Sequence, residues 1–130
     1  MSDTEVRLGY LGNSSPEVQS VALTKELTKL AELIVNIRES RADAEMVALG
    51  ELALTTLDLV SAMAHSSSIY STLVDEITVW RKLAELWIGS IKAGTADTSK
   101  SYLSVCNQAG VVYEKLIQES LNAGVEIGGR

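Results

Sequence analysis

The chain has 130 residues, of which 46% are hydrophobic and 22% charged, and its 17 Asp and Glu against 11 Lys and Arg give a formal net charge of −6. This length suits one domain and the apolar fraction excludes wholesale disorder, while one cysteine and one histidine exclude an internal disulfide and leave too few ligands for a zinc site. The acidic balance argues against a nucleic-acid partner. With neither a signal peptide nor a charge-free apolar run of about 18 residues, we expect a cytoplasmic protein that does not cross a membrane.

Within residues 1–15, the stretch 5–11 alternates apolar and polar side chains, which is typical of an extended segment, and residues 12–15 break this pattern. The apolar positions of this segment are Val6, Leu8 and Tyr10. The last residues, 124–130, show similar alternation at their start. We expect these ends to act as assembly arms that pair with each other or with a neighbouring subunit; the alternative is two frayed ends.

A helix is predicted over residues 16–39, with Ser15 as its N-cap and Pro16 in the first turn. Its core positions recur at spacings of three and four residues, and they are Leu23, Leu27, Leu30, Ile34 and Ile37. Leu33 and Val35 extend this apolar stripe on either side. We expect a tight connection near Ser40, although one continuous helix through residue 64 is the alternative.

The second predicted helix, residues 41–64, is the most apolar segment, because 15 of its 24 residues are apolar. Its polar positions shrink to one narrow line, formed by Glu51, Thr55 and Asp58. A helix that is apolar on most of its circumference must be buried on most of it. We therefore predict a shared interface with a partner protein or a second copy, at Val47, Leu54 and Leu59 together with Leu33 and Val35.

A third helix is predicted from a serine cap within residues 66–68 to Gly94, with Trp80 and Trp87 on its core face. These two indoles fill the core of a chain without Phe, or alternatively line a ligand pocket. The fourth helix, residues 99–123, is expected to turn one stripe inward. The residues of this stripe are Leu103, Cys106, Gly110, Tyr113 and Ile117, with Val112, Leu116 and Leu121 alongside.

Candidate catalytic groups are few. His65 is the one side chain with an ordinary pKa near neutrality, and a histidine phosphotransfer domain is a four-helix bundle of similar size, but no Lys follows His65 here. The acidic side chains are expected to be solvated helix flanks, and Cys106 lacks a neighbouring cation that would activate it. We assign no catalytic, cofactor-binding or metal-ligating residue.

Together these patterns predict an all-α, antiparallel four-helix bundle over residues 16–123, with extended arms at 1–15 and 124–130. We expect a non-enzymatic protein that acts through protein–protein contacts, either by self-association or as a small subunit or accessory factor of a larger assembly. Proteins of this kind are common among viral and mobile-element genes. The alternative is a signalling or ligand-binding bundle that uses His65.

Overall fold

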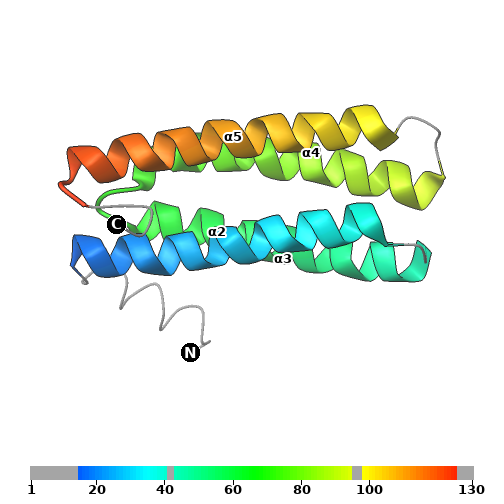
Figure 1. Cartoon of the computed structure of the whole chain (residues 1–130), viewed down its shortest axis with the longest axis horizontal. Helices are drawn as coiled ribbons and strands as arrows, with labels where there is room; N and C mark the ends of the chain where they lie inside the picture. Colours follow the sequence, from blue (N-terminus) through cyan, green and yellow to red (C-terminus); the bar gives the residue numbers. More distant parts are fainter. Residues whose placement is uncertain (1–14, 41–42, 95–97, 126–130) are drawn as a thin grey trace.

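The computed structural model describes residues 15–40, 43–94 and 98–125. Four α-helices run antiparallel to their neighbours in chain order and form an all-α four-helix bundle, as the sequence predicts (Figure 1). A short 3₁₀ turn precedes the third helix. The elements are α2 (Pro16–Glu39), α3 (Asp43–Ser66), η1 (Ser71–Leu73), α4 (Val74–Ala93) and α5 (Thr98–Asn122). The predicted arm residues Val6, Leu8 and Tyr10 lie outside the described residues.

The start and end of α2 follow the local chemistry of the sequence. The Ser15 hydroxyl accepts a hydrogen bond from the Val18 N–H at 3.3 Å, which satisfies one of the free donors of the first turn. At the other end Ser40 is extended, with φ −66° and ψ 143°. The chain therefore breaks between α2 and α3, and the predicted connection near Ser40 is confirmed against the single long helix.

The connection from α3 to α4 differs from the predicted serine cap. The Ser67 hydroxyl accepts from the N–H groups of Ile69 and Tyr70, both at 3.0 Å. It therefore caps a turn and not a helix, and η1 follows. The helix α4 begins only at Val74, without a side-chain cap at its start.

Two glycines end helices in the left-handed conformation that favours this residue. Gly94 follows α4 with φ 65°, and Gly124 follows α5 with φ 76°. After α5, the Val125 N–H donates to the Ser120 carbonyl at 2.8 Å and the Gly124 N–H to the Leu121 carbonyl at 3.0 Å. This is a Schellman cap, so the first two residues of the predicted tail 124–130 close a helix, and the rest of that tail lies outside the described residues.

The core confirms the predicted stripe of α2, because all five of its residues are at most 6% exposed. Trp80 and Trp87 are also buried, which supports core filling over a ligand pocket. The Trp80 indole N–H has no hydrogen-bond partner among the described residues. An unpaired buried donor costs about 1–3 kcal/mol, so the free energy gained by burying the large apolar ring must offset this cost.

The main positions of the predicted inward stripe of α5 are wrong, whereas Val112 and Leu116, predicted alongside it, are buried. Leu103 is 58% exposed and Ile117 46% exposed, Gly110 is exposed, and Cys106 and Tyr113 are half-buried. The side chains that α5 turns inward lie one position earlier along the chain: Tyr102, Val105, Ala109, Val112, Leu116 and Ser120. Both stripes recur at helical spacing, so the spacing alone did not select the buried one.

Candidate functional site

Buried polar side chains gather at the end of the bundle where α2 begins. The Gln19 carbonyl oxygen accepts from the Ser67 hydroxyl at 2.6 Å, and its amide nitrogen donates to the Ser68 hydroxyl at 3.2 Å. Nearby, the Tyr70 and Ser120 hydroxyls share a hydrogen bond at 2.6 Å. These groups satisfy one another and fix the α3–α4 turn against α2 and α5, so they form a structural network.

His65 lies in the last turn of α3, where the helix dipole favours a positive charge. Its side chain is exposed, and among the described residues no hydrogen bond or ion pair aligns it with a base or a nucleophile. Among the described residues, no three His, Cys, Asp or Glu side chains are placed to hold a metal ion. The geometry around His65 thus adds nothing to the phosphotransfer alternative.

Two acidic side chains of α3 pair with bases on α4. Arg81 Nε donates to Asp58 Oδ1 at 2.8 Å and also pairs with Glu85, and Lys92 Nζ lies 3.0 Å from Glu51 Oε1. The hydrogen bond to Asp58 is the main cause that raises the pKa of Arg81 above its ordinary value. These pairs are partly solvated, and they tie the outer edges of two helices together.

Gly50 lies at the inner contact between α3 and α4. A Cβ atom built at Gly50 would lie 2.9 Å from Ile88 Cγ2, well inside ordinary contact distance. The absence of a side chain therefore lets the two helices approach closely. We call this contact, with its ion pairs outside and Gly50 inside, the α3–α4 seam.

The contact between α2 and α5 is looser, because their backbones approach less closely than those of the other three neighbouring pairs. Long side chains bridge it. The Tyr113 hydroxyl donates to the Leu27 carbonyl at 3.0 Å, and the Arg38 guanidinium lies 5.3 Å from the centre of the Tyr102 ring. Among the described residues no ion pair crosses this contact, which we call the α2–α5 seam.

Both tyrosines of the α2–α5 seam have raised pKa values. Burial raises the pKa of Tyr113. A hydrogen bond with Cys106, and then burial, raise that of Tyr102. The Tyr102 ring also contacts Trp87, with ring centres 5.2 Å apart and planes tilted by 53°. Both phenols therefore keep their protons to a higher pH than an exposed tyrosine does.

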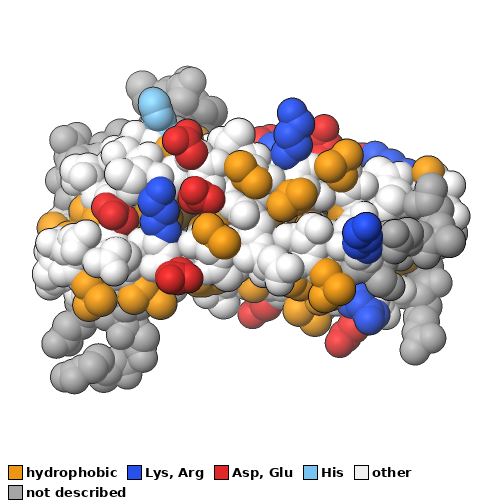
Figure 2. All heavy atoms as spheres, turned by 90° about the horizontal axis from the view of Figure 1, so that it is seen from above, with side chains coloured by type: hydrophobic (Ala, Val, Ile, Leu, Met, Phe, Trp, Pro, Cys, Tyr) orange, Lys and Arg blue, Asp and Glu red, His pale blue; other side chains and the backbone are white. Residues whose placement is uncertain are grey.

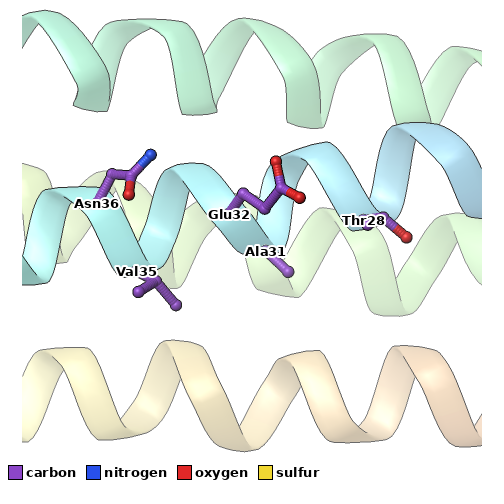
Figure 3. Close-up of a pocket in the computed structure, with 5 residues that line it drawn as sticks. All are labelled: Thr28, Ala31, Glu32, Val35 and Asn36. Carbon is purple, nitrogen blue, oxygen red and sulfur yellow. The ribbon is translucent and has the colours of Figure 1, made fainter.

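An open depression of about 410 Å³ lies beside α2. Its lining residues are Thr28, Ala31, Glu32, Val35 and Asn36. Figure 3 shows Ala31 and Val35 on the side of α2 toward α5, and Glu32 and Asn36 turned toward α3. A single helix supplies the lining and no buried polar group points into the hollow, so this depression lacks the enclosed, convergent geometry of a small-molecule site.

The exposed hydrophobic side chains are the least expected feature of the surface. Figure 2, which looks onto α4 and α5, shows hydrophobic side chains between the charged ones. Three of the most exposed share one flank of α5: Leu121 at 61%, Leu103 at 58% and Ile117 at 46%. With Gly110, they form what we call the outer stripe of α5. Helical periodicity places this stripe on the margin of the α2–α5 seam.

The predicted interface residues are distributed differently from this stripe. Val35 is 46% exposed and lies at the depression. Leu33 is only 8% exposed, so it belongs to the core and is removed from the candidate surface. Val47, Leu54 and Leu59 are half-buried, and the last two pack against the core. The sequence pattern missed Leu103, Ile117 and Leu121 as surface residues because it assigned them to the core.

The segment Ala44–Ser66 is long and apolar enough to cross a membrane by length and composition alone, with a mean hydropathy of 1.5. Only 33% of that stretch is buried in the bundle. Core helices of soluble proteins also meet this criterion. Glu51 and Asp58, which form ion pairs with α4, also place charge along this helix. The length and composition of the segment therefore do not distinguish a membrane span from a core helix.

Comparisons of the chain with family models, with curated proteins and with solved structures find no match.

Proposed function

We propose that this chain is a non-enzymatic helical bundle that works through protein–protein contacts, by self-association or as a small subunit of a larger assembly. The observation that carries the proposal is the outer stripe of α5, where Leu103, Ile117 and Leu121 are each about half exposed or more. Scattered single hydrophobic residues on a surface need no explanation. These three align along one flank of one helix, which favours a contact with another helix.

The chemistry of the other candidate sites supports the same function. The buried hydroxyls and amide of the polar network already have partners within the bundle. Two of the acids of α3, Asp58 and Glu51, are engaged with Arg81 and Lys92. Neither set offers a free group arranged for acid–base or nucleophilic chemistry, so recognition of a protein surface is the function that the remaining features favour.

The test compares two variants that add equal charge to the surface. Leu103→Asp combined with Ile117→Asp alters the outer stripe, while Leu86→Asp combined with Val79→Asp alters exposed positions of α4. Each pair, as well as the wild-type chain, is used for affinity capture from the native host and for light scattering after size exclusion. We expect the α5 pair to abolish association that the wild type and the α4 pair retain.

Equal association by all three proteins would contradict the assignment of the surface. The proposal fails if two results are found together. The wild-type chain is monomeric, and every protein that it captures is also captured by the variant with Leu103→Asp and Ile117→Asp. Circular dichroism at low concentration serves as the folding control, since all four positions are exposed and their replacement should leave helix content unchanged.

A further inference from the structure

We propose that the outer stripe of α5 binds the outer stripe of a second copy of this chain, antiparallel, about a two-fold axis that passes at Gly110. This inference rests on the proposed function and names the partner of its surface. A two-fold interface uses the same patch on both subunits, so a patch suits it only if it is complementary to itself.

The spacing along the outer stripe has this property. Leu103 and Ile117 each lie seven residues, or two helical turns, from Gly110. When two such helices cross antiparallel at Gly110, Leu103 of each copy faces Ile117 of the other. A large apolar side chain therefore meets a large apolar side chain on both sides of the axis.

Gly110 provides the close approach at the centre. A Cβ atom at this position would meet nothing within 4 Å, so Gly110 serves no contact inside the bundle. A helical glycine costs about 1 kcal/mol of helix propensity relative to alanine. Its place midway between two exposed hydrophobic residues lets a second helix backbone come near, as small residues do at other close helix crossings.

The two polar side chains within the stripe also match. Asn107 and Glu114 are exposed and lie three residues before and four residues after Gly110. In the antiparallel arrangement, Asn107 of one copy comes within about one residue of the level of Glu114 of the other. An amide N–H can donate to a carboxylate at each of these two symmetric places.

The distribution of charge favours α5 over α3 for contact between identical acidic chains. The helix α3 carries four acidic residues and no Lys or Arg, whereas α5 carries two Lys and two Glu. The bases of α4 pair with Glu51 and Asp58, so two copies that met through α3 would repel each other only through the acidic charge that these pairs leave. Two copies that met through α5 would bring together surfaces of zero net charge.

The size of the surface indicates a reversible dimer. From Leu103 to Leu121 the stripe spans about 27 Å of helix, and the depression that contains Ala31 and Val35 lies on the other side of the α2–α5 seam. One helix pair with such an edge falls at the low end of specific interfaces. We therefore expect a dissociation constant on the order of micromolar.

Cysteine cross-linking tests the axis directly. In a Cys106→Ser background, Gly110→Cys places two thiols next to each other at the axis, so we expect a disulfide-linked dimer under mild oxidation. Gly89→Cys in the same background is the matched control, because Gly89 is also exposed, helical and without neighbours within 4 Å. The expected result is fast cross-linking at residue 110 and little at residue 89.

Charge pairs test the antiparallel order. Leu103→Lys with Ile117→Glu in one chain places opposite charges across both contacts, while Leu103→Glu with Ile117→Glu places like charges there. We expect the second pair to raise the dimer dissociation constant at least about tenfold above the first. Equal constants, or equal cross-linking at residues 89 and 110, would overturn the two-fold arrangement.

The two proposals fail in different ways. A wild-type chain that self-associates without preferential cross-linking at residue 110 contradicts the arrangement and leaves the proposed function standing. A second outcome also contradicts the two-fold arrangement and leaves the proposed function standing. In that outcome the wild-type chain is monomeric but captures another protein, which the variant with Leu103→Asp and Ile117→Asp no longer captures. A monomeric chain without any partner that depends on α5 contradicts both.

Discussion

The α3–α4 seam and the α2–α5 seam each have a helical glycine at or near them, and the two glycines have opposite surroundings. Across the first, Gly50 admits Ile88 and ion pairs tie Glu51 and Asp58 to α4. Across the second, the Tyr113 side chain bridges helices whose backbones approach less closely, and a Cβ atom at Gly110, on the margin of this seam, would meet nothing within 4 Å. Gly50 therefore serves the packing of two helices within the bundle. Gly110 faces solvent between hydrophobic residues, so a second molecule can approach the helix there.

The largest expected effect separates the two stripes of α5. Leu116 is 2% exposed and its neighbour Ile117 is 46% exposed. We expect Leu116→Ala to lower the free energy of unfolding by about 2–5 kcal/mol, because it leaves a core cavity. Ile117→Ala should cost less than about 1 kcal/mol. Denaturant unfolding at low protein concentration measures both, and a reversed order would mean that the other stripe forms the core.

The next effect contrasts the two glycines. Gly50→Ala forces a methyl group against buried Ile88, and this overpacking should cost about 1–3 kcal/mol, partly offset by better helix propensity. Gly110→Ala has open space and should stabilise the monomer by about 0.5–1 kcal/mol. Gly89→Ala is the control for pure propensity. Thermal unfolding of the three variants should therefore show one loss and two gains; a gain for Gly50→Ala would sink the close contact of α3 and α4.

A smaller effect concerns the bridge across the α2–α5 seam. Tyr113→Phe removes the hydrogen bond to the Leu27 carbonyl and should cost about 1 kcal/mol near neutral pH. Because burial raises the pKa of Tyr113 in the folded chain, the unfolded chain loses its proton first as the pH rises past about 10. Stability therefore falls with rising pH in that range.

We expect Tyr113→Phe to reduce this alkaline loss, while Tyr102, whose pKa is also raised, keeps contributing to it. Measurement of the free energy of unfolding as a function of pH checks both parts. An identical slope in the wild type and the variant above pH of about 10 would contradict the burial of the Tyr113 phenol.

The smallest effect concerns the ion pairs of the α3–α4 seam. Arg81→Gln removes the contacts to Asp58 and Glu85 and should cost about 0.2–1 kcal/mol, because the pairs are partly solvated. Lys82→Gln removes the same charge at an exposed neighbouring position and should change stability by less than about 0.5 kcal/mol. The difference should shrink at high salt. If the difference in stability between the two variants persisted at high salt, the effect of Arg81 would come from its packing and not from its charge.

The fold follows from the sequence wherever one stripe of a helix is clearly the most apolar. In α2, Leu23, Leu27 and Leu30 have no competing set at the same spacing, and all are buried. In α5 two neighbouring stripes are both apolar, and a shift of one residue exchanges them. The choice depends on how α5 packs against the other helices, which periodicity within α5 does not contain.

The candidate site was harder to predict for the same reason. The excess apolar content of α3 indicated an interface there, but packing between α2 and α4 leaves Leu54 and Leu59 half-buried against the core. The residue that could have indicated the outer stripe from the sequence is Gly110, because a glycine within a helix lowers the stability of that helix. The sequence also contains Gly50 and Gly89, and only the three-dimensional packing distinguishes their roles.

The most direct measurement follows the methyl groups of the wild-type chain by nuclear magnetic resonance during dilution from submillimolar to low micromolar concentration. If α5 is the association surface, the signals of Leu103, Ile117 and Leu121 should shift together, while those of Leu54 and Leu59 on α3 and of Leu86 on α4 stay constant. Concentration-dependent shifts at Leu54 and Leu59 with none at Leu103 and Ile117 would contradict it.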